Sequence, residues 1–548
     1  MIPKKIIILF STALFTVSAC QDLDLVNPST INSADVWNDP KLIDMYVNLL
    51  HYNMPGWDTR FPHNIADEAR SNYAGQASNQ YLIGDWDDTN NPNDNWEAAY
   101  RNIRIVNDFL QNIPNAGVSE DVKRLTSAEV RFFRGLYYFN LVKRYGGVPL
   151  IKTSQTLDED LQVPRNSLDE CFQFIIDEMD AIAGDLPRDA ARGKITGGAA
   201  LALKARALLY YASALYNPSN DVSRWQQAAS AAKAVMDLGK YDLYPDLKTL
   251  WLDNSPSHPE IILEKTYAMP NASHGWDACV KTLDLAIADA GQCSPLQELI
   301  DAFPMKTGKM IHESGSGYDP NNPYVGRDDR FYTYIGYNQS IMSGMQGGVL
   351  NKNYVLQIYR GGNDYDNPGG NPLNQDYTTR TGYFCLKAVN PDNTQYSFGR
   401  GSVQPWIEFR YGETLLNFAE AENEANGPSA AVYEALDKIR QRAGITANLD
   451  RNLNQEQMRS LIRNERYIEL CFEQHRYWDL RRWKLAETVL NGRKYTGVVI
   501  PKESDGTFSY DYQPVDAQNL VYESRMNFMP IQMNELSKNG KLEQNPGW

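Results

Sequence analysis

Residues 196–216 constrain the fold most, because their pattern is that of a helix covered on two sides. Two faces of this predicted helix carry apolar or small residues at helical spacing: Ala200, Leu203, Ala207, Tyr210 and Ala214 on one, and Leu201, Ala205, Leu208, Ala212 and Leu215 on the other. Such a helix must pack between neighbours, and its alanines allow those neighbours to approach closely. The segment therefore predicts stacked antiparallel helices, as in tetratricopeptide-type repeats.

Other segments show the same helical spacing of apolar residues. They predict further helices over 95–114, 122–146, 168–183, 225–238, 406–426 and 430–443. Ser167 is placed as the N-cap of the third of these segments. Because the sequence does not repeat cleanly at a tetratricopeptide period, we expect degenerate repeats. The predicted fold class is a mostly α-helical, solenoid-like scaffold.

Two long polar and aromatic stretches interrupt the helices. They span residues 66–92 and 304–401, and both are rich in Tyr, Asn and Gly. Loops longer than about 12–15 residues are usually functional or disordered, and disordered segments are poor in aromatic residues. The chain also exceeds the usual single core of roughly 250–300 residues. We therefore predict a second, loop-rich lobe that carries the binding site.

The first twenty residues predict export and lipidation. Lys4 and Lys5 precede an apolar run over 6–17, which is too short for the roughly 20 residues that span a bilayer. Small residues then lead to Cys20, as in lipobox-type sites that are cleaved before an acylated cysteine. We predict a signal peptide over 1–19 and a lipid anchor at Cys20. The alternative is a secreted protein with an incidental cysteine.

The net charge and the cysteine pattern argue against several classes of ligand and site. The net charge of −15 argues against nucleic acid and anionic surfaces unless the charge is locally inverted. No Cys-x-x-Cys pair indicates zinc or a redox centre. Beyond Cys20, five cysteines allow at most two disulfides, and Cys279 and Cys293 are the nearest pair in sequence. Buried free thiols are the favoured interpretation.

The sequence predicts binding rather than catalysis. It contains no His-Glu-x-x-His, Gly-x-Ser-x-Gly, P-loop or dinucleotide motif, and its six histidines are scattered. An acid pair for glycoside hydrolysis that assembles only in space stays open as an alternative. Aromatic rings cover the apolar face of a sugar while polar side chains bond to its hydroxyls, and the first long loop supplies both kinds of group. The candidates are Asp67, Arg70, Tyr73, Tyr81 and Trp86. A peptide ligand, or simple packing of the loop onto the helices, would use the same residues.

Residues 463–483 combine arginines, acids and aromatic side chains. Arg466 and Glu469, Glu473 and Arg476, and Asp479 and Arg482 are spaced i, i+3, where opposite charges meet on a helix. The interleaved acids argue against a nucleic-acid patch. We predict an ion-paired helix whose aromatic residues hold it against the scaffold.

The run Glu473–Trp483 resembles the C-terminal hallmark of the SusD/RagB family of nutrient-binding outer-membrane lipoproteins. Gln474 stands where the family usually has Gly. Further matches to the family lie at residues 96–107, 131–149, 204–216, 410–426, 436–444 and 544–548. These matches cover essentially the whole mature chain in the expected order.

This resemblance implies about four tetratricopeptide-like helix pairs beside an irregular ligand-binding lobe. It also implies a lipoprotein on the outer membrane, facing outside, that binds an oligosaccharide and passes it to a SusC-like TonB-dependent transporter. Some members bind peptides, which keeps that alternative open. The helix pairs would face the transporter. We expect an N-terminal region over 20–260 and a C-terminal region over 261–548, with the loop-rich insertion at 304–401.

The resemblance places the ligand site in the early loop and the middle insertion. From the second half of the chain it adds Trp276, Tyr324 and Tyr337 to the candidates of the first loop. It implies neither a catalytic residue nor a cofactor. The acidic stretch 364–376 is compatible with the structural calcium that occurs in some relatives.

Overall fold

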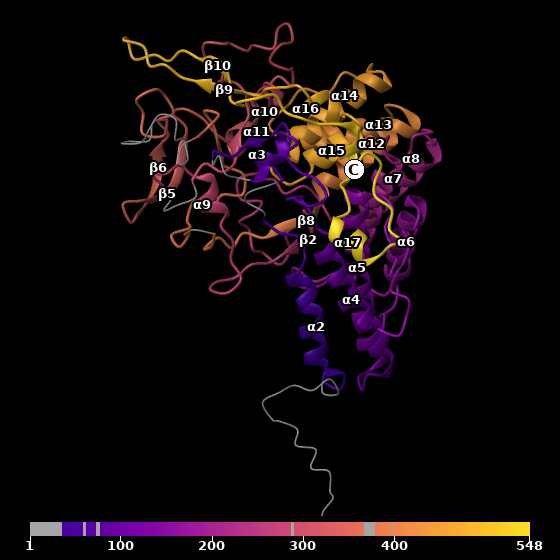
Figure 1. Cartoon of the computed structure of the whole chain (residues 1–548). Coiled ribbons are helices and arrows are strands. Elements are labelled where there is room, and N and C mark those ends of the chain that lie inside the picture. Colours follow the sequence, from indigo (N-terminus) through magenta and orange to yellow (C-terminus); the bar gives the residue numbers. More distant parts are fainter. Residues whose placement is uncertain (1–35, 58–61, 73–76, 286–289, 366–378, 398) are drawn as a thin grey trace, which may run out of the picture.

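The computed structural model describes residues 36–57, 62–72, 77–285, 290–365, 379–397 and 399–548, and the predicted signal peptide and Cys20 lie outside them. Long helices form one side of the molecule (Figure 1). They are α2 (Pro40–Tyr52), α4 (Trp96–Asn112), α5 (Glu120–Tyr145), α6 (Leu168–Ile182), α7 (Gly197–Ala212), α8 (Val222–Asp237), α12 (Tyr411–Asn426), α13 (Ala430–Arg442) and α14 (Gln455–Glu469). The prediction of a mostly helical chain is confirmed.

The scaffold consists of packed helix pairs, as predicted. Helices α4 and α5, α6 and α7, and α8 and α12 pack as neighbours, while α13 and α14 complete the array around α12. Helix α7 packs on both α6 and α8, which explains why its sequence is apolar on two faces. The partner of α8 is α12, although about 170 residues separate them in the chain. Sequence order alone pairs α12 with α13 and leaves α8 without a partner.

Local signals in the sequence set the helix ends. Ser167 accepts a hydrogen bond from the backbone of Glu170, whose side chain returns one, so that a capping box starts α6. Ser119 caps α5 by accepting a hydrogen bond from the backbone of Val122, and Gly146, with φ of 75°, ends the helix. Helix α7 ends at Ala212, four residues before the predicted end at Tyr216.

The second lobe is irregular and lies on the other side of the helices (Figure 1). Its short helices are α9 (Trp276–Val280), α10 (Gln297–Ala302) and α11 (Asp329–Tyr334). The other short helices, α3 (Ala77–Leu82), α15 (Arg476–Arg482), α16 (Ala486–Leu490) and α17 (Met533–Lys538), pack on the core of the helical side. Short 3-10 helices span Ile113–Asn115 and Ser524–Asn527. The lobe has its own buried core, built around Trp276, Phe303, Phe331 and Tyr383.

Antiparallel two-stranded sheets support this lobe. They pair β1 (Ala69–Arg70) with β3 (Ser294–Pro295), β2 (Ile261–Lys265) with β8 (Trp406–Arg410), β4 (Ile335–Gly336) with β7 (Phe384–Cys385), β5 (Ile341–Gln346) with β6 (Val349–Val355), and β9 (Thr496–Val499) with β10 (Asp511–Pro514). The prediction of a helix from residue 406 is wrong for its first five residues. In Trp406–Arg410 the side chains alternate between two faces, and the backbone bonds to β2, so this segment is a strand.

Residues 463–483, which the sequence predicts as an ion-paired helix, are also not one helix. Helix α14 ends at Glu469, and Phe472 and Gln474 adopt left-handed backbone conformations with φ of 61° and 63° before α15 begins. Of the three predicted i, i+3 ion pairs, only Asp479–Arg482 forms, at 2.8 Å. The break in the helix turns the other charges toward partners on distant elements.

Buried charges of residues 463–483 therefore tie the two lobes together. Glu469 accepts hydrogen bonds from Arg330, Arg410 and Arg442. These cations hold the pKa of Glu469 far below its usual range, although burial alone would raise it. Removing one partner from such a group leaves an uncompensated buried charge.

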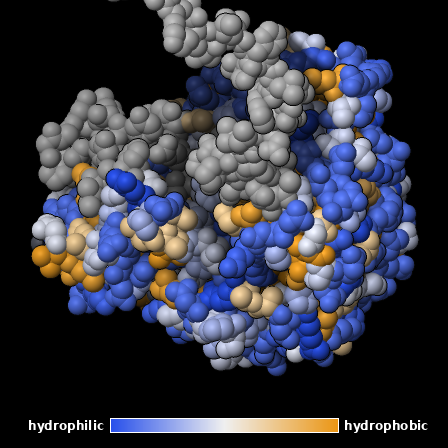
Figure 2. All heavy atoms as spheres, turned by 90° about the horizontal axis from the view of Figure 1, so that it is seen from below, coloured by the Kyte–Doolittle hydropathy of each residue, from blue (hydrophilic) through white to orange (hydrophobic). Residues whose placement is uncertain are grey.

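The remaining predictions on chain chemistry concern thiols and membranes. Cys171, Cys279, Cys293, Cys385 and Cys471 are buried and are not joined in disulfides, as favoured by the sequence. Among the described residues, no helix is both long enough and apolar enough to cross a membrane. Seen from below, the exposed side chains are mostly hydrophilic, with small, separate hydrophobic patches (Figure 2).

Candidate ligand-binding surface

The first predicted loop is fixed by ion pairs rather than open to solvent. Asp67 is buried and accepts two hydrogen bonds from Arg476, at 2.8 and 2.7 Å. Arg70 lies in β1, is fully buried and pairs with Asp516 at 2.8 Å. Tyr73 lies outside the described residues. Asp67 and Arg70 thus hold the base of the loop, and their predicted role in ligand contact stays a prediction.

Tyr81 and Trp86 form the next part of this loop and are buried. Their rings stack with centroids 4.5 Å apart, and Trp86 also contacts Trp548 at 4.7 Å. The Trp86 indole donates to the backbone oxygen of Tyr81 at 3.2 Å. Trp86 is only 5% exposed, so both faces of its ring are engaged within the protein. These contacts are those expected if Tyr81 and Trp86 pack the loop onto the helices, which is the alternative to ligand binding.

Trp276 is likewise an interior residue. It starts α9, is fully buried, and donates its indole hydrogen to the backbone oxygen of Lys387 at 2.9 Å. Its ring stacks on Trp57 at 4.5 Å. Trp57 is half-buried, so it is the member of this pair that reaches the surface.

Tyr324 and Tyr337 do come together, in a group of aromatic side chains. Their ring centroids are 4.7 Å apart. Tyr324 is buried and Tyr337 is half-buried, and both pack at the edge of the core of the second lobe. This edge is therefore where the insertion predicted to bind ligand presents aromatic surface.

A row of three aromatic residues completes the group from the far end of the chain. Phe508, Tyr510 and Tyr512 alternate along the extended segment that enters β10, so their side chains share one face. Each one meets an aromatic residue of the insertion. Phe508 contacts Tyr359 at 5.4 Å and Tyr510 contacts Tyr324 at 5.4 Å, while Tyr512 lies beside Tyr318.

We call Phe508, Tyr510 and Tyr512 the aromatic row. Phe508 and Tyr510 are half-buried and Tyr512 is 39% exposed. The three rings therefore pack on the insertion and still expose part of their surface to solvent. Burial raises the pKa of Tyr512, whose hydroxyl stays protonated at neutral pH and is able to donate a hydrogen bond. A supported ring beside hydroxyl groups suits a ligand with an apolar face and polar edges.

A small pocket lies at the same hairpin and links it to the first loop. Its volume is about 200 Å³, and Tyr365, Arg380 and Gln513 are among its lining residues. The Arg380 guanidinium donates to the backbone oxygens of Val515, at 2.9 Å, and Ser71, at 3.4 Å. The early loop and the insertion, which the family resemblance assigns to the ligand site, are thus joined at this edge.

The aromatic row was missed in the sequence analysis. Its signal is the period-two run Phe508-Ser-Tyr-Asp-Tyr512, which is typical of a strand with one aromatic face. The run lies outside both long loops, so a prediction based on loop length does not include it.

Metal ligation finds no support in the described part of the chain. No group of three or more His, Cys, Asp or Glu side chains is placed to hold a metal ion there. Asp364 is buried and bonds to Thr282 and Tyr354, whereas residues 366–376 of the predicted calcium stretch lie outside the described residues.

Comparison with family models gives two matches along the chain. Residues 259–548 match the model of the SusD family, and residues 23–209 match a model described as starch-binding and associating with the outer membrane. The SusD-like protein P2 of Formosa agariphila is 24% identical over 502 residues, which cover 88% of this chain and 86% of the relative. A SusD-like protein of Bacteroides ovatus is 23% identical over 78% of this chain and 73% of its own.

Solved structures share the fold. The crystal structure of a SusD-like protein from Bacteroides fragilis is 27% identical, covers 94% of this chain and 99% of its own, and superposes with a TM-score of 0.80. A structure titled as a laminarin-binding SusD-like protein has a TM-score of 0.65 at 20% identity, covering 93% of this chain and 100% of its own.

Proposed function

The chain belongs to the SusD family, and on that premise we propose that it is a surface lipoprotein of the outer membrane that binds an oligosaccharide or polysaccharide and delivers it to a SusC-like TonB-dependent transporter. The observation that carries the proposal is the match of family models to both halves of the chain, one of them described as starch-binding. The neighbour titled as laminarin-binding supports a glycan as the ligand class.

We place glycan contact at the aromatic row and the adjoining tyrosines. Pyranose rings present C–H faces that pack on tyrosine and phenylalanine, and the phenol hydroxyls and nearby polar side chains bond to sugar hydroxyls. Tyr512 is the most exposed member of the row and lies close enough to Tyr318 for that hydroxyl to affect its pKa. A ring already held in place loses little entropy when a ligand binds.

The test is calorimetric titration of the protein lacking residues 1–20 against polysaccharides and oligopeptides. Tyr512→Ala is expected to weaken binding of one glycan class about tenfold, or about 1.4 kcal/mol, as for an aromatic contact near the centre of an interface. The matched control is Tyr52→Ala, which removes a tyrosine that is 65% exposed on α2. Equal affinity of both variants would remove the row from the site.

The second candidate is an oligopeptide as the ligand, because tyrosine-lined surfaces serve either class. Binding of peptides without any glycan signal would replace the proposed ligand and leave the family unchanged. We propose no catalytic role, since the aromatic row contains no acidic side chains that could act as a catalytic pair. Release of reducing sugar from the bound polysaccharide by the purified protein would refute that part.

The anchor and the transporter contact are further parts of the proposal. Cys20→Ala is expected to release the protein from membranes and to abolish labelling with radioactive palmitate. Met45, Leu49 and Tyr52 expose 62%, 45% and 65% of their surface at i, i+4 and i+7 on α2. This apolar stripe follows the anchor in the chain, so we propose it as a contact with the transporter. Leu49→Asp is expected to reduce co-purification of the two proteins.

A further inference from the structure

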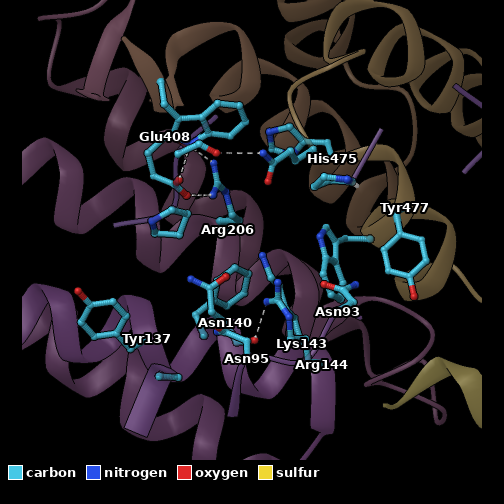
Figure 3. Close-up of a pocket in the computed structure, with 18 of the residues that line it drawn as sticks. Asn93, Asn95, Tyr137, Asn140, Lys143, Arg144, Arg206, Glu408, His475 and Tyr477 are labelled. Atoms are coloured by element: carbon cyan, nitrogen blue, oxygen red, sulfur yellow. Dashed lines mark hydrogen bonds and ion pairs between the residues drawn. The ribbon is translucent and has the colours of Figure 1, made fainter. Parts of the chain in front are cut away.

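A second pocket lies between the helical scaffold and the hallmark segment. It has a volume of about 280 Å³, at the lower end of the range for small-ligand sites. Residues of α4, α5, α7 and β8 line it, together with the turn that starts α15. In Figure 3, Lys143 and Arg144 of α5 point toward the side of the pocket that holds Arg206 and His475.

Two adjacent cations in this pocket have no carboxylate partner in the part of the chain that the structure describes. Among the described residues, neither Lys143 nor Arg144 forms an ion pair. Arg144 donates to the backbone oxygen of Asn140 at 3.1 Å, and its Nε is buried without an acceptor. Both cations lie over the ring of Trp478, at 4.7 and 4.9 Å from its centroid. Burial, and then Arg144, lower the pKa of Lys143 well below its usual range.

The acids that line the pocket are already engaged elsewhere. Glu408 pairs with Arg206 at 2.6 Å, and Glu473 pairs with Lys387 and Arg410, each at 2.6 Å. Of the charged side chains that line the pocket in the described part of the chain, Lys143 and Arg144 are thus the two without an ion pair, in a protein whose net charge is −15. An uncompensated buried charge is unfavourable, and an anion placed beside it would offset that penalty.

Donors on the adjoining wall favour the same kind of ligand. Helix α4 begins at this pocket, and its N-cap Asn95 makes no side-chain capping bond. The positive end of the helix dipole therefore faces the space occupied by Lys143. Asn93 and Asn95 lie beside the two cations in Figure 3, where amide groups are available for hydroxyls as well as for an anion.

We infer that this pocket binds a small hydroxylated carboxylate of about monosaccharide size, of the uronate class, with its carboxylate on Lys143 and Arg144 and its hydroxyls on the asparagine amides. The carboxylate would supply the acidic partner that neither cation has among the described residues, and charge-assisted bonds of this kind are among the stronger polar contacts. The site is separate from the aromatic row and does not require the row to bind a glycan.

The first experiment uses the wild-type protein lacking residues 1–20 and three probes in calorimetric titrations. Sodium glucuronate is expected to bind, glucose to bind at least tenfold more weakly, and sodium sulfate to compete with glucuronate. Equal binding of glucose and glucuronate would overturn the role of the charge. Sulfate that binds as tightly as glucuronate would overturn the saccharide assignment and leave a simple anion site.

The second experiment uses variants. Lys143→Met is expected to lose at least about tenfold in glucuronate affinity, the range for a hydrogen bond to a charged group, while Lys143→Arg retains binding. Lys233→Met on α8 is the matched control, because Lys233 is 57% exposed. Loss of binding in Lys143→Arg as well as Lys143→Met, with both variants folded, would refute the assignment.

The two sites are distinguishable by a crossed test. Tyr512→Ala should leave glucuronate affinity unchanged, and Lys143→Met should leave the affinity for a neutral polysaccharide unchanged. Failure of the aromatic row to bind any glycan would not affect the result for glucuronate. A loss of glucuronate binding in Tyr512→Ala would show that one site had been mistaken for two.

Discussion

Substitution of Trp86 distinguishes clearly between a role in ligand contact and a role in packing. Its indole is 5% exposed, stacks on Tyr81 at 4.5 Å and meets Trp548 at 4.7 Å. Replacing a buried Trp with Ala costs about 3–5 kcal/mol through lost burial and the cavity left behind. The hydrogen bond from the indole to Tyr81, at 3.2 Å, adds to that loss. We therefore expect Trp86→Ala to destabilise the protein by about 4 kcal/mol.

The assay is urea unfolding of Trp86→Ala and Trp86→Phe, followed by glycan titration of each folded variant. Trp86→Phe keeps a stacked ring and loses the N–H group, so it should cost about 1–2 kcal/mol. The protein has two lobes, so the unfolding curves from far-ultraviolet circular dichroism and from fluorescence are compared, and a free energy is taken only where the two coincide. An unchanged urea midpoint together with lost glycan binding would refute the packing role and restore Trp86 as a ligand contact.

Three further predictions concern buried charge and backbone strain. Glu469→Gln should cost about 3–5 kcal/mol in urea unfolding, because it leaves three buried arginines without their shared acid; a loss below 1 kcal/mol would contradict this. Burial, and then Asp67, raise the pKa of Glu68 from 4.5 to about 8, so the folded state binds the extra proton and wild-type stability falls as pH rises from 4.5 to 8. Glu68→Gln should remove that fall, seen as a smaller difference between urea midpoints at pH 5 and pH 8. Gln474 has φ of 63°, so Gln474→Gly should be more stable than Gln474→Ala by about 1 kcal/mol, the reverse of the usual order.

The helical scaffold could be predicted from sequence because its signals are local. Capping residues such as Ser167, the turn glycine Gly146 and the doubly apolar segment of α7 each fix an element without reference to the rest of the chain. The pairing of α8 with α12 could not be predicted, since it depends on where the chain returns after the whole insertion. The helix prediction for Trp406–Arg410 is wrong for the same reason, because the partner strand β2 is distant in sequence.

The candidate site was harder to predict because aromatic side chains serve cores and ligand surfaces alike. Trp276 and Tyr337 look equivalent in sequence, yet the first is fully buried and the second reaches the edge of the lobe. Only tertiary packing decides between these outcomes. The aromatic row and the cationic pocket are products of contacts between distant segments, as when Tyr510 meets Tyr324 at 5.4 Å.

The hallmark segment shows why a family signature identifies a fold without naming a ligand. Glu473 bonds to Arg410 in β8, and Arg476 bonds to Asp67 at the base of the first loop. Each charge thus holds a different element, and because the pairs are buried, loss of one partner is far more costly than at the surface. The identity of these residues is restricted because their ion pairs hold the two lobes together. The rings that face solvent make no such pairs, so they are free to change with the ligand. The ligand must therefore be inferred from the surfaces that these ion pairs hold in place.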